Sequence, residues 1–319
     1  MINNTSVIVL TPVKNEDWIL ETFLQVTSLF ADLIIVADQG STDRTLEIIG
    51  RFPKAVHVPN EREEYDEEYR QILLIEKARE LVPGRRLLLA LDADELMFAE
   101  AIGHAEWHTL TSLEPGTRIM MKKPDLLPGY ETYIDYPNHF HLGYMDDGAA
   151  HKGKKFHSTR LPQGKRVYHC EHLRVMHYAL VRDKEYKARQ RLYAVMENID
   201  QSSSLVTRYR KYSRKLQRQG YLKWVKPTPP SWLSDFKDRD FKVTGFPSSE
   251  DNNFNRRILE KFQDHGSRRF WWEDIWYVDY RALSPSTPVQ KPPFFVNLGR
   301  DYYIRSLSVL LRYRNRTKH

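Results

Sequence analysis

The sequence predicts an α/β fold in which a mostly parallel sheet is flanked by helices, followed by a basic helical C-terminal extension. Four short apolar runs in the first hundred residues alternate with stretches whose apolar residues recur at helical spacing. Strands and helices that alternate at this distance form parallel sheets with right-handed crossovers. The length of 319 residues allows one large domain or two ordinary ones.

The predicted elements follow in chain order. The apolar runs are typical of strands with both faces covered, at residues 6–10, 33–37, 55–58 and 86–91. Helical spacing predicts helices at residues 17–30, 43–51 and 67–81. Further along, we expect a strand at 118–122, irregular loops at 130–144, basic helices within 180–212, a long loop or arm at 226–253, and helices at 255–263 and 301–313. We therefore divide the chain into an α/β part, residues 1–180, and a basic, aromatic-rich part of helices and loops, residues 181–319.

Charge is distributed unevenly along the chain. The first 100 residues hold 10 Lys+Arg and 19 Asp+Glu, a net charge of −9, and the remaining 219 hold 39 and 23, a net charge of +16. Cys170 is the one cysteine, so no disulfide can form within the chain, and we expect a reducing, cytoplasmic compartment. The N-terminal apolar run is too short for a signal peptide, and no run of about 18 apolar residues predicts a membrane span.

Polar clusters follow three of the predicted strands. They are TPVKNE from Thr11, DQGSTDRT from Asp38 and DADE from Asp92. Ligands of open parallel sheets bind beyond the carboxyl ends of the strands, so these clusters predict a site. An alternative stays open for the first two clusters, because their residues can simply cap the helices that follow. Asn15 or Asp17 would cap the first helix, and Ser41, Thr42 or Asp43 would cap the next.

The pair Asp92 and Asp94 is the most informative of these features. Two carboxylates one residue apart at the end of a strand point to the same side and repel each other unless a cation lies between them. Hard oxygen ligands suit Mg²⁺ or Mn²⁺, and such an ion keeps positions open for a phosphate.

Taken together, TPVKNED, ADQGSTDRT and LDADE resemble the inverting glycosyltransferases of family 2, whose fold is called GT-A. The resemblance covers about the first third of the chain. It implies a UDP-, GDP- or dTDP-sugar donor, held by residues of these motifs: Thr11, Pro12, Val13, Asn15, Glu16, Asp38, Gln39, Asp92, Ala93 and Asp94. Within that set it implies that Thr11, Pro12 and Glu16 line the nucleoside pocket. Asp38 would bind the base, and the D-x-D pair would meet the ribose and the metal on the diphosphate.

The chain departs from the family at two places. Gln39 stands where many members have a second Asp, and the acidic run at residues 61–68 replaces a loop that contains Gly and Asn. Arg70, on the next predicted helix, is expected to contact the diphosphate as basic residues of relatives do. The alternative is an exposed ion pair with Asp66 or Glu67.

An inverting transfer also needs a group that accepts the proton of the attacking hydroxyl. We expect Asp147 or Asp146 to be this catalytic base, with an ordinary Asp-Gly turn as the alternative, and Asp125 and Glu171 as further candidates. GT-A enzymes often supply a distal His to the metal, which favours His177 as the third ligand beside Asp92 and Asp94, with His172 second. A core histidine bonded to the backbone is the alternative interpretation.

The basic second part suits RNA, an anionic membrane surface, or an acidic or lipid-linked acceptor. No RNA-binding module is recognisable, so we expect no specific nucleic acid, and we expect peripheral contact with the inner membrane face through the C-terminal basic segment. The sequence thus predicts a metal-dependent glycosyltransferase of polysaccharide biosynthesis that acts on a glycan or lipid-linked hydroxyl. The alternatives are a sugar-phosphate nucleotidyltransferase, which lacks support because TPVKNED has no Gly-rich loop, and a non-catalytic protein that binds nucleic acid or anionic surfaces.

Overall fold

A computed structural model of the chain describes residues 5–62, 65–155, 158–213, 222–250 and 252–316. The chain divides into two compact units. Unit 1 comprises residues 1–181 and 226–246, and unit 2 comprises residues 182–225 and 247–319. The return of residues 226–246 to unit 1 differs from the sequence-based division at residue 180.

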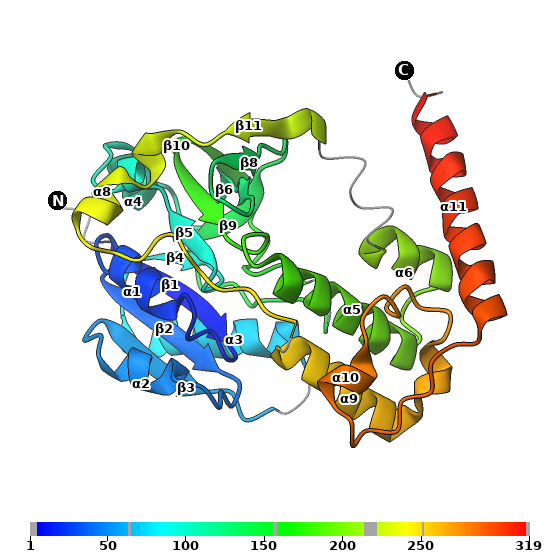
Figure 1. Cartoon of the computed structure of the whole chain (residues 1–319). Helices are drawn as coiled ribbons and strands as arrows, with labels where there is room; N and C mark the ends of the chain where they lie inside the picture. The colour runs from blue at the N-terminus through cyan, green and yellow to red at the C-terminus, as the bar shows by residue number, and fades with distance from the viewer. Residues whose placement is uncertain (1–4, 63–64, 156–157, 214–221, 251, 317–319) are drawn as a thin grey trace. The chain divides into compact units, whose positions relative to one another are not determined.

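Unit 1 is built on a mixed sheet in which β3, β2, β1 and β4 are parallel neighbours (Figure 1). These strands are β1 (Ser6–Val13), β2 (Leu33–Asp38), β3 (Ala55–Pro59) and β4 (Arg86–Ala90). The intervening helices are α1 (Leu20–Thr27), α2 (Thr45–Gly50) and α3 (Glu67–Leu81). All seven predicted elements of the first ninety residues are therefore present, and the α/β fold with a Rossmann-like sheet is confirmed.

The rest of the sheet is mixed. Strand β9 (Phe140–Met145) lies antiparallel between β4 and β6 (Thr117–Lys122), and β10 (Arg166–His177) continues the sheet parallel to β6. Smaller elements complete the unit: β5 (Glu95–Met97), η1 (Ala99–Ala101), α4 (Glu106–Ser112), β7 (Asp125–Leu126), β8 (Thr132–Ile134), β11 (Val225–Pro227), η3 (Pro230–Trp232) and α8 (Ser234–Asp238). The expectation of irregular loops at 130–144 was wrong, because pairing with β4, β6 and β7 makes strands of a Tyr- and Pro-rich sequence.

Alternation along the strands explains the apolar runs. Val7 and Val9 belong to the core on one face of the sheet, and Ile8 and Leu10 belong to the core on the other face. Helix α1 covers the first face and α3 covers the second, so the parallel strands are apolar on both sides. This packing leaves the carboxyl ends of the strands as the polar edge of the sheet.

Unit 2 is helical in its described part. Its elements are α5 (Asp183–Ile199), α6 (Leu205–Tyr212), η2 (Leu222–Trp224), α9 (Asn253–His265), η4 (Ser267–Phe270), α10 (Tyr280–Leu283) and α11 (Phe294–Arg316). A core of side chains from α5, α9, η4 and α10 holds them together, including the stacked rings of Phe262 and Trp276. In the described part of the chain, no helix combines the length and apolar content needed to cross a bilayer.

Candidate functional site

The loops after β1 and β2 are tied to each other at the polar edge of the sheet. Asn15 adopts a left-handed backbone (φ 58°), its N–H donates to Ser41 Oγ at 2.8 Å, and its Oδ1 accepts from Thr42 N at 2.7 Å. Asp38 at the end of β2 accepts from the N–H of Ser41 at 3.1 Å. The capping residues of the sequence-based alternative thus join two loops instead of acting on one helix alone.

The other predicted donor residues of this edge have defined positions. Thr11, Pro12 and Val13 form the last three residues of β1, in register with Val36, Ala37 and Asp38. Glu16 accepts from the indole of Trp18 at 2.7 Å, and Gln39 donates to the carbonyl of Arg62 at 3.0 Å. Arg70 lies with its guanidinium 5.1 Å from the ring centroid of Tyr65. The exposed partner of Asp66 is Arg62, at 2.6 Å.

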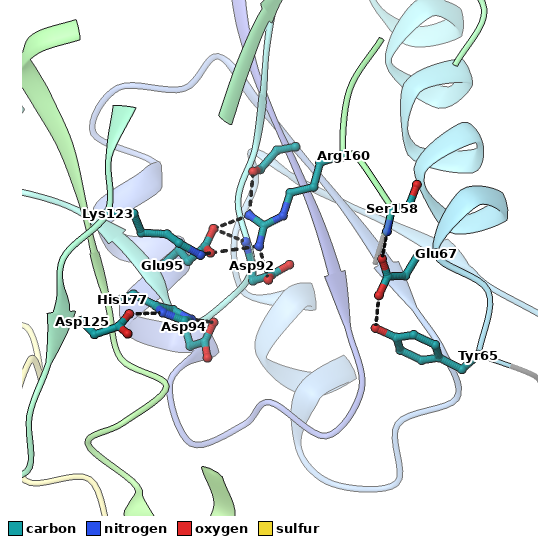
Figure 2. Close-up of polar contacts among 11 residues, drawn as sticks. Tyr65, Glu67, Asp92, Asp94, Glu95, Lys123, Asp125, Ser158, Arg160 and His177 are labelled. Carbon is teal, nitrogen blue, oxygen red and sulfur yellow. Dashed lines mark hydrogen bonds and ion pairs between the residues drawn. The ribbon is translucent and has the colours of Figure 1, made fainter. Parts of the chain in front are cut away.

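The guanidinium of Arg160 holds the turn that carries Asp92 (Figure 2). Its Nη2 donates to Asp92 Oδ2 at 2.5 Å, and its Nη1 donates to the carbonyl of Ala90 at 3.1 Å. Ala90 ends β4, so one side chain binds both the strand end and the first carboxylate of the D-x-D pair. On the Asp92 side, an arginine therefore supplies the positive charge that two neighbouring carboxylates require.

Glu95 is the buried centre of this network. Its Oε2 accepts from Arg160 Nη1 at 2.5 Å and from the N–H of Asp92 at 3.0 Å, and its Oε1 accepts from Lys123 Nζ at 2.7 Å. Burial raises the pKa of Glu95, but the charges of Arg160 and Lys123 lower it by more, and the pKa lies well below its usual range. Glu95 is therefore ionised and fixes the turn between Asp92 and Asp94.

Asp94 faces a different partner, His177 at the end of β10 (Figure 2). His177 Nδ1 lies 2.6 Å from Asp125 Oδ1, and His177 Nε2 lies 3.6 Å from Asp94 Oδ1. Burial raises the pKa of Asp125, but His177, Tyr136 and Lys123 lower it by more, so this carboxylate accepts the Nδ1 proton. In the neutral imidazole, Nε2 is then an acceptor directed at a carboxylate oxygen.

This geometry fits a divalent cation at Asp94 and His177. Two facing acceptors need a proton or a cation between them, and 3.6 Å is within the span of two ligand bonds of about 2.0–2.2 Å each. The cluster of Asp92, Asp94, Glu95 and Asp125 with Lys123 and Arg160 carries a formal charge of −2 when His177 is neutral. Within the described residues, no group of three His, Cys, Asp or Glu side chains is arranged to hold a metal. Water or phosphate oxygens would complete such a shell, as Mg²⁺ commonly requires.

Asp146 and Asp147, the predicted candidates for the catalytic base, lie away from this edge, and the structure does not bring them to the Asp92–Asp94 turn. β9 runs antiparallel to β4 with Met145 opposite Leu87, so Asp146 reaches the amino end of β4, with about 13 Å of strand before the D-x-D turn. Asp146 is buried between Arg79 and Arg86, at 2.8 and 2.9 Å. Asp147 accepts from the hydroxyl of Tyr144 at 2.6 Å.

The acidic run at residues 61–68 anchors the loop that delivers Arg160. Glu68 Oε1 accepts from the N–H of Gly153 at 2.9 Å, and Glu67 Oε2 accepts from the N–H of Ser158 at 2.7 Å. The hydroxyl of Tyr65 donates to the other oxygen of Glu67 at 2.7 Å (Figure 2). The departure from the family pattern at this run therefore has a structural use, because it fixes the backbone two residues before Arg160.

Sequence reasoning did not predict the ion-pair network of Arg160, Lys123 and Glu95 with Asp92. Glu95 had a local signal, since it directly follows the D-x-D pair on a buried stretch. Arg160 lies 68 positions from its partner Asp92 and Lys123 lies 28 positions from Glu95, and no local pattern marks either pairing.

Comparisons with known proteins yield structural neighbours alone. The sequence matches no protein-family model and no curated protein. Two solved structures of S. aureus TarS residues 1–349, one in complex with UDP, are 12% identical and cover 97% of this chain and 92% of theirs, with TM-scores of 0.41 and 0.42. Glucosyl-3-phosphoglycerate synthase from Mycobacterium tuberculosis, in complex with Mn²⁺, UDP and glucosyl-3-phosphoglycerate, is 19% identical over 38% of this chain and 44% of its own, with a TM-score of 0.26. These scores are too low to carry an argument, so the fold is defined by the strand order of unit 1.

Proposed function

We propose that this protein is a metal-dependent, inverting glycosyltransferase of family 2 with a GT-A fold. It transfers a sugar from a UDP-, GDP- or dTDP-sugar to a hydroxyl of a glycan or lipid-linked acceptor. The observation that carries the proposal is the facing pair of Asp94 and His177, at the edge where the loops after β1 and β2 meet. The surrounding cluster holds four carboxylates and two cations, Lys123 and Arg160. An anionic nucleotide binds such an edge when a divalent cation is shared between the two.

Different residues at this edge of the sheet bind different parts of the donor. Thr11, Pro12, Val13, Asn15, Glu16, Asp38 and Gln39 form the nucleoside pocket, and Asp92 orients the ribose. Asp94 and His177 hold Mg²⁺ or Mn²⁺, and the ion, when bound, takes up charge on the departing diphosphate. Arg160 and Glu95 keep Asp92 in place, so the D-x-D turn is ordered before the donor arrives. Arg70 contacts the diphosphate of the donor.

We also propose a cellular setting for the reaction. Unit 2 holds 25 Lys+Arg and 12 Asp+Glu, a net charge of +13, whereas unit 1 has a net charge of −6. A basic unit suits an acidic or lipid-linked acceptor and a peripheral contact with an anionic membrane. The single cysteine, Cys170, is buried and free, which is consistent with the cytoplasm.

The test is nucleoside diphosphate release from a panel of nucleotide sugars with Mn²⁺, Mg²⁺ or chelator. We expect turnover with one donor class and a divalent ion, and a loss of about 10²–10³-fold in Asp94→Asn, because one ligand of the leaving-group cation is removed. The matched control is Glu47→Gln, an exposed acid of the same unit that pairs with Arg44 alone.

Binding is measured in parallel by thermal shift. The donor with metal should raise the Tm of the wild type and of Glu47→Gln, and should not raise that of Asp94→Asn. Full turnover in Asp94→Asn or in chelator would refute the metal assignment. Release of pyrophosphate from a sugar phosphate and a nucleoside triphosphate would identify a nucleotidyltransferase instead.

A further inference from the structure

Exposed apolar side chains gather on one element of unit 2. Of the eleven large apolar side chains that are exposed in the described part of the chain, seven lie on α11 or against it. They are Trp272, Phe294, Phe295, Leu298, Tyr302, Tyr303 and Val309, and we call them the aromatic stripe. Scattered exposed apolar residues are ordinary, whereas a contiguous group of this kind marks an interaction surface.

Five of the seven stripe residues lie opposite the face by which α11 packs on its own unit. The buried residues of the helix are Val296, Arg300, Ile304 and Leu307, and the strongly exposed apolar ones are Phe294, Phe295, Leu298, Tyr302 and Val309. At about 100° per residue, the buried set and the exposed set are centred about 180° apart on the helix. The helix is therefore apolar on two opposite faces, and packing within the unit uses one of them.

The packing face is fully engaged. Ile304 and Leu307 form a cluster with Tyr209 of α6. Arg300 is buried and donates to the carbonyl of Trp271 at 3.1 Å and to Asn297 Oδ1 at 2.8 Å. The ring of Tyr303 also lies 6.1 Å from that of Tyr209, so this stripe residue shares in the packing. The exposed side chains of Phe294, Phe295, Leu298, Tyr302 and Val309 are not among the residues of this packing face.

The chemistry of the stripe and of its surroundings favours lipid as the occupant. Five of the seven side chains are aromatic, and Trp and Tyr are the residues that anchor proteins at the boundary between headgroups and acyl chains. The net charge of +13 on unit 2 is complementary to anionic headgroups. The same charge opposes the approach of a second copy through this unit.

We propose that the aromatic stripe is the surface by which this protein lies on an anionic lipid bilayer, with α11 parallel to the membrane plane. The inference rests on the membrane contact of the proposed function and specifies the side chains that make it. Apolar side chains enter the headgroup region while basic residues of the unit meet the lipid phosphates.

The experiment is co-sedimentation of the full chain with phosphatidylcholine vesicles, with and without phosphatidylglycerol. The stripe variant combines Phe295→Gln, Leu298→Gln and Tyr302→Gln, which removes exposed apolar area and keeps good helix formers. The control variant combines Leu46→Gln, Ile72→Gln and Leu81→Gln, three exposed apolar residues of unit 1. We expect the wild type and the control to bind vesicles that contain phosphatidylglycerol, less so with added salt, and the stripe variant to lose at least about tenfold in apparent affinity.

Two outcomes with the stripe variant overturn the inference. One is wild-type affinity in the stripe variant. The other is light scattering that finds an oligomer for the wild type and a monomer for the stripe variant, which would make the stripe a contact between copies. Failure of the wild type to bind any vesicle refutes both the membrane contact and the stripe, and leaves nucleotide-sugar turnover in lipid-free buffer to be judged independently. Loss of vesicle binding in the stripe variant alone supports the inference even if no donor is turned over.

Discussion

The two ends of strand β4 both carry buried carboxylates and differ in their balance of charge. At the amino end, Asp146 lies between Arg79 and Arg86, so one carboxylate meets two cations. At the carboxyl end, the carboxylates of Asp92, Asp94, Glu95 and Asp125 meet two cations, Lys123 and Arg160. The first arrangement is compensated by the protein itself, and the second retains negative charge.

This difference separates a structural acid from a functional one. A buried carboxylate that is matched by guanidinium groups stays ionised and fixes its neighbours. Uncompensated negative charge is unfavourable in the folded state until a cation binds, so it is retained where a cation has a use. In the sequence, Asp146 stands beside an Asp-Gly pair, which favoured a catalytic loop. In the structure, Asp146 pairs with Arg79 and Arg86 at the opposite end of β4 from the Asp92–Asp94 turn.

The largest effect on stability is expected when the compensation at the carboxyl end is removed. Arg160→Ala should lower the free energy of unfolding by about 3–5 kcal/mol, because it leaves the buried Glu95 with Lys123 alone. Urea denaturation measures the loss. Arg160→Lys should restore part of it, and Arg44→Ala, which removes an exposed pair, should cost less than about 1 kcal/mol. Unchanged stability in Arg160→Ala would mean that Arg160 does not compensate the buried charge of Glu95 at the carboxyl end of β4.

A smaller loss of stability is expected for a substitution at the amino end of β4. Asp146→Asn should lower the free energy of unfolding by about 2–3 kcal/mol, because Arg79 and Arg86 keep their bonds to backbone carbonyls when the charge between them is lost. Turnover per folded molecule should stay within about twofold of the wild type. Asp147→Asn is the neighbouring control, with an exposed side chain and a smaller loss. A turnover that collapses in Asp146→Asn while the fold persists would return this acid to the catalytic role.

The smallest effect on stability is expected for Glu106, whose carboxylate accepts hydrogen bonds from backbone N–H groups and a hydroxyl instead of pairing with a cation. Burial raises the pKa of Glu106, but the N–H groups of Glu171, Leu173 and His172 and the hydroxyl of Tyr168 lower it by more, to below 4.5. A depressed pKa stabilises the fold above the unfolded value and loses this effect as pH falls through the folded value. Glu106→Gln should therefore cost about 1–2 kcal/mol near neutral pH.

Comparing the wild type with Glu106→Gln at several pH values tests whether the ionised form of Glu106 is the stabilising one. The difference in unfolding free energy between wild type and Glu106→Gln should shrink as pH falls below about 4.3, the ordinary pKa of Glu, and through the lower pKa of Glu106 in the folded state. Denaturation at several pH values measures it. A difference that grows with acidity has the wrong sign and would show that the backbone N–H groups do not stabilise the ionised form.

Much of unit 1 was predictable because its signals are local. Apolar runs with both faces buried predict parallel strands, and the residues that follow them have the turn chemistry that strand ends need. Asp38, Asp92 and Asp94 were predicted at strand ends for this reason, as was His177, and the structure has them at or directly after the ends of β2, β4 and β10. Residues 226–246 were not predicted to join unit 1, because their packing there depends on partners far away in the chain, as when the carbonyl of Lys242 accepts from Thr22.

The sequence by itself determined the order of strands and helices in the first third, the D-x-D turn and the contrast between an acidic front and a basic rear. Tertiary structure decided which charges compensate which. Because β9 runs antiparallel to β4, Asp146 is carried to the amino end of the sheet, while the loop docked on Glu67 and Glu68 brings Arg160 back to the carboxyl end. Such pairings join residues tens of positions apart, and their energy depends on burial and distance, which no local pattern in a sequence encodes.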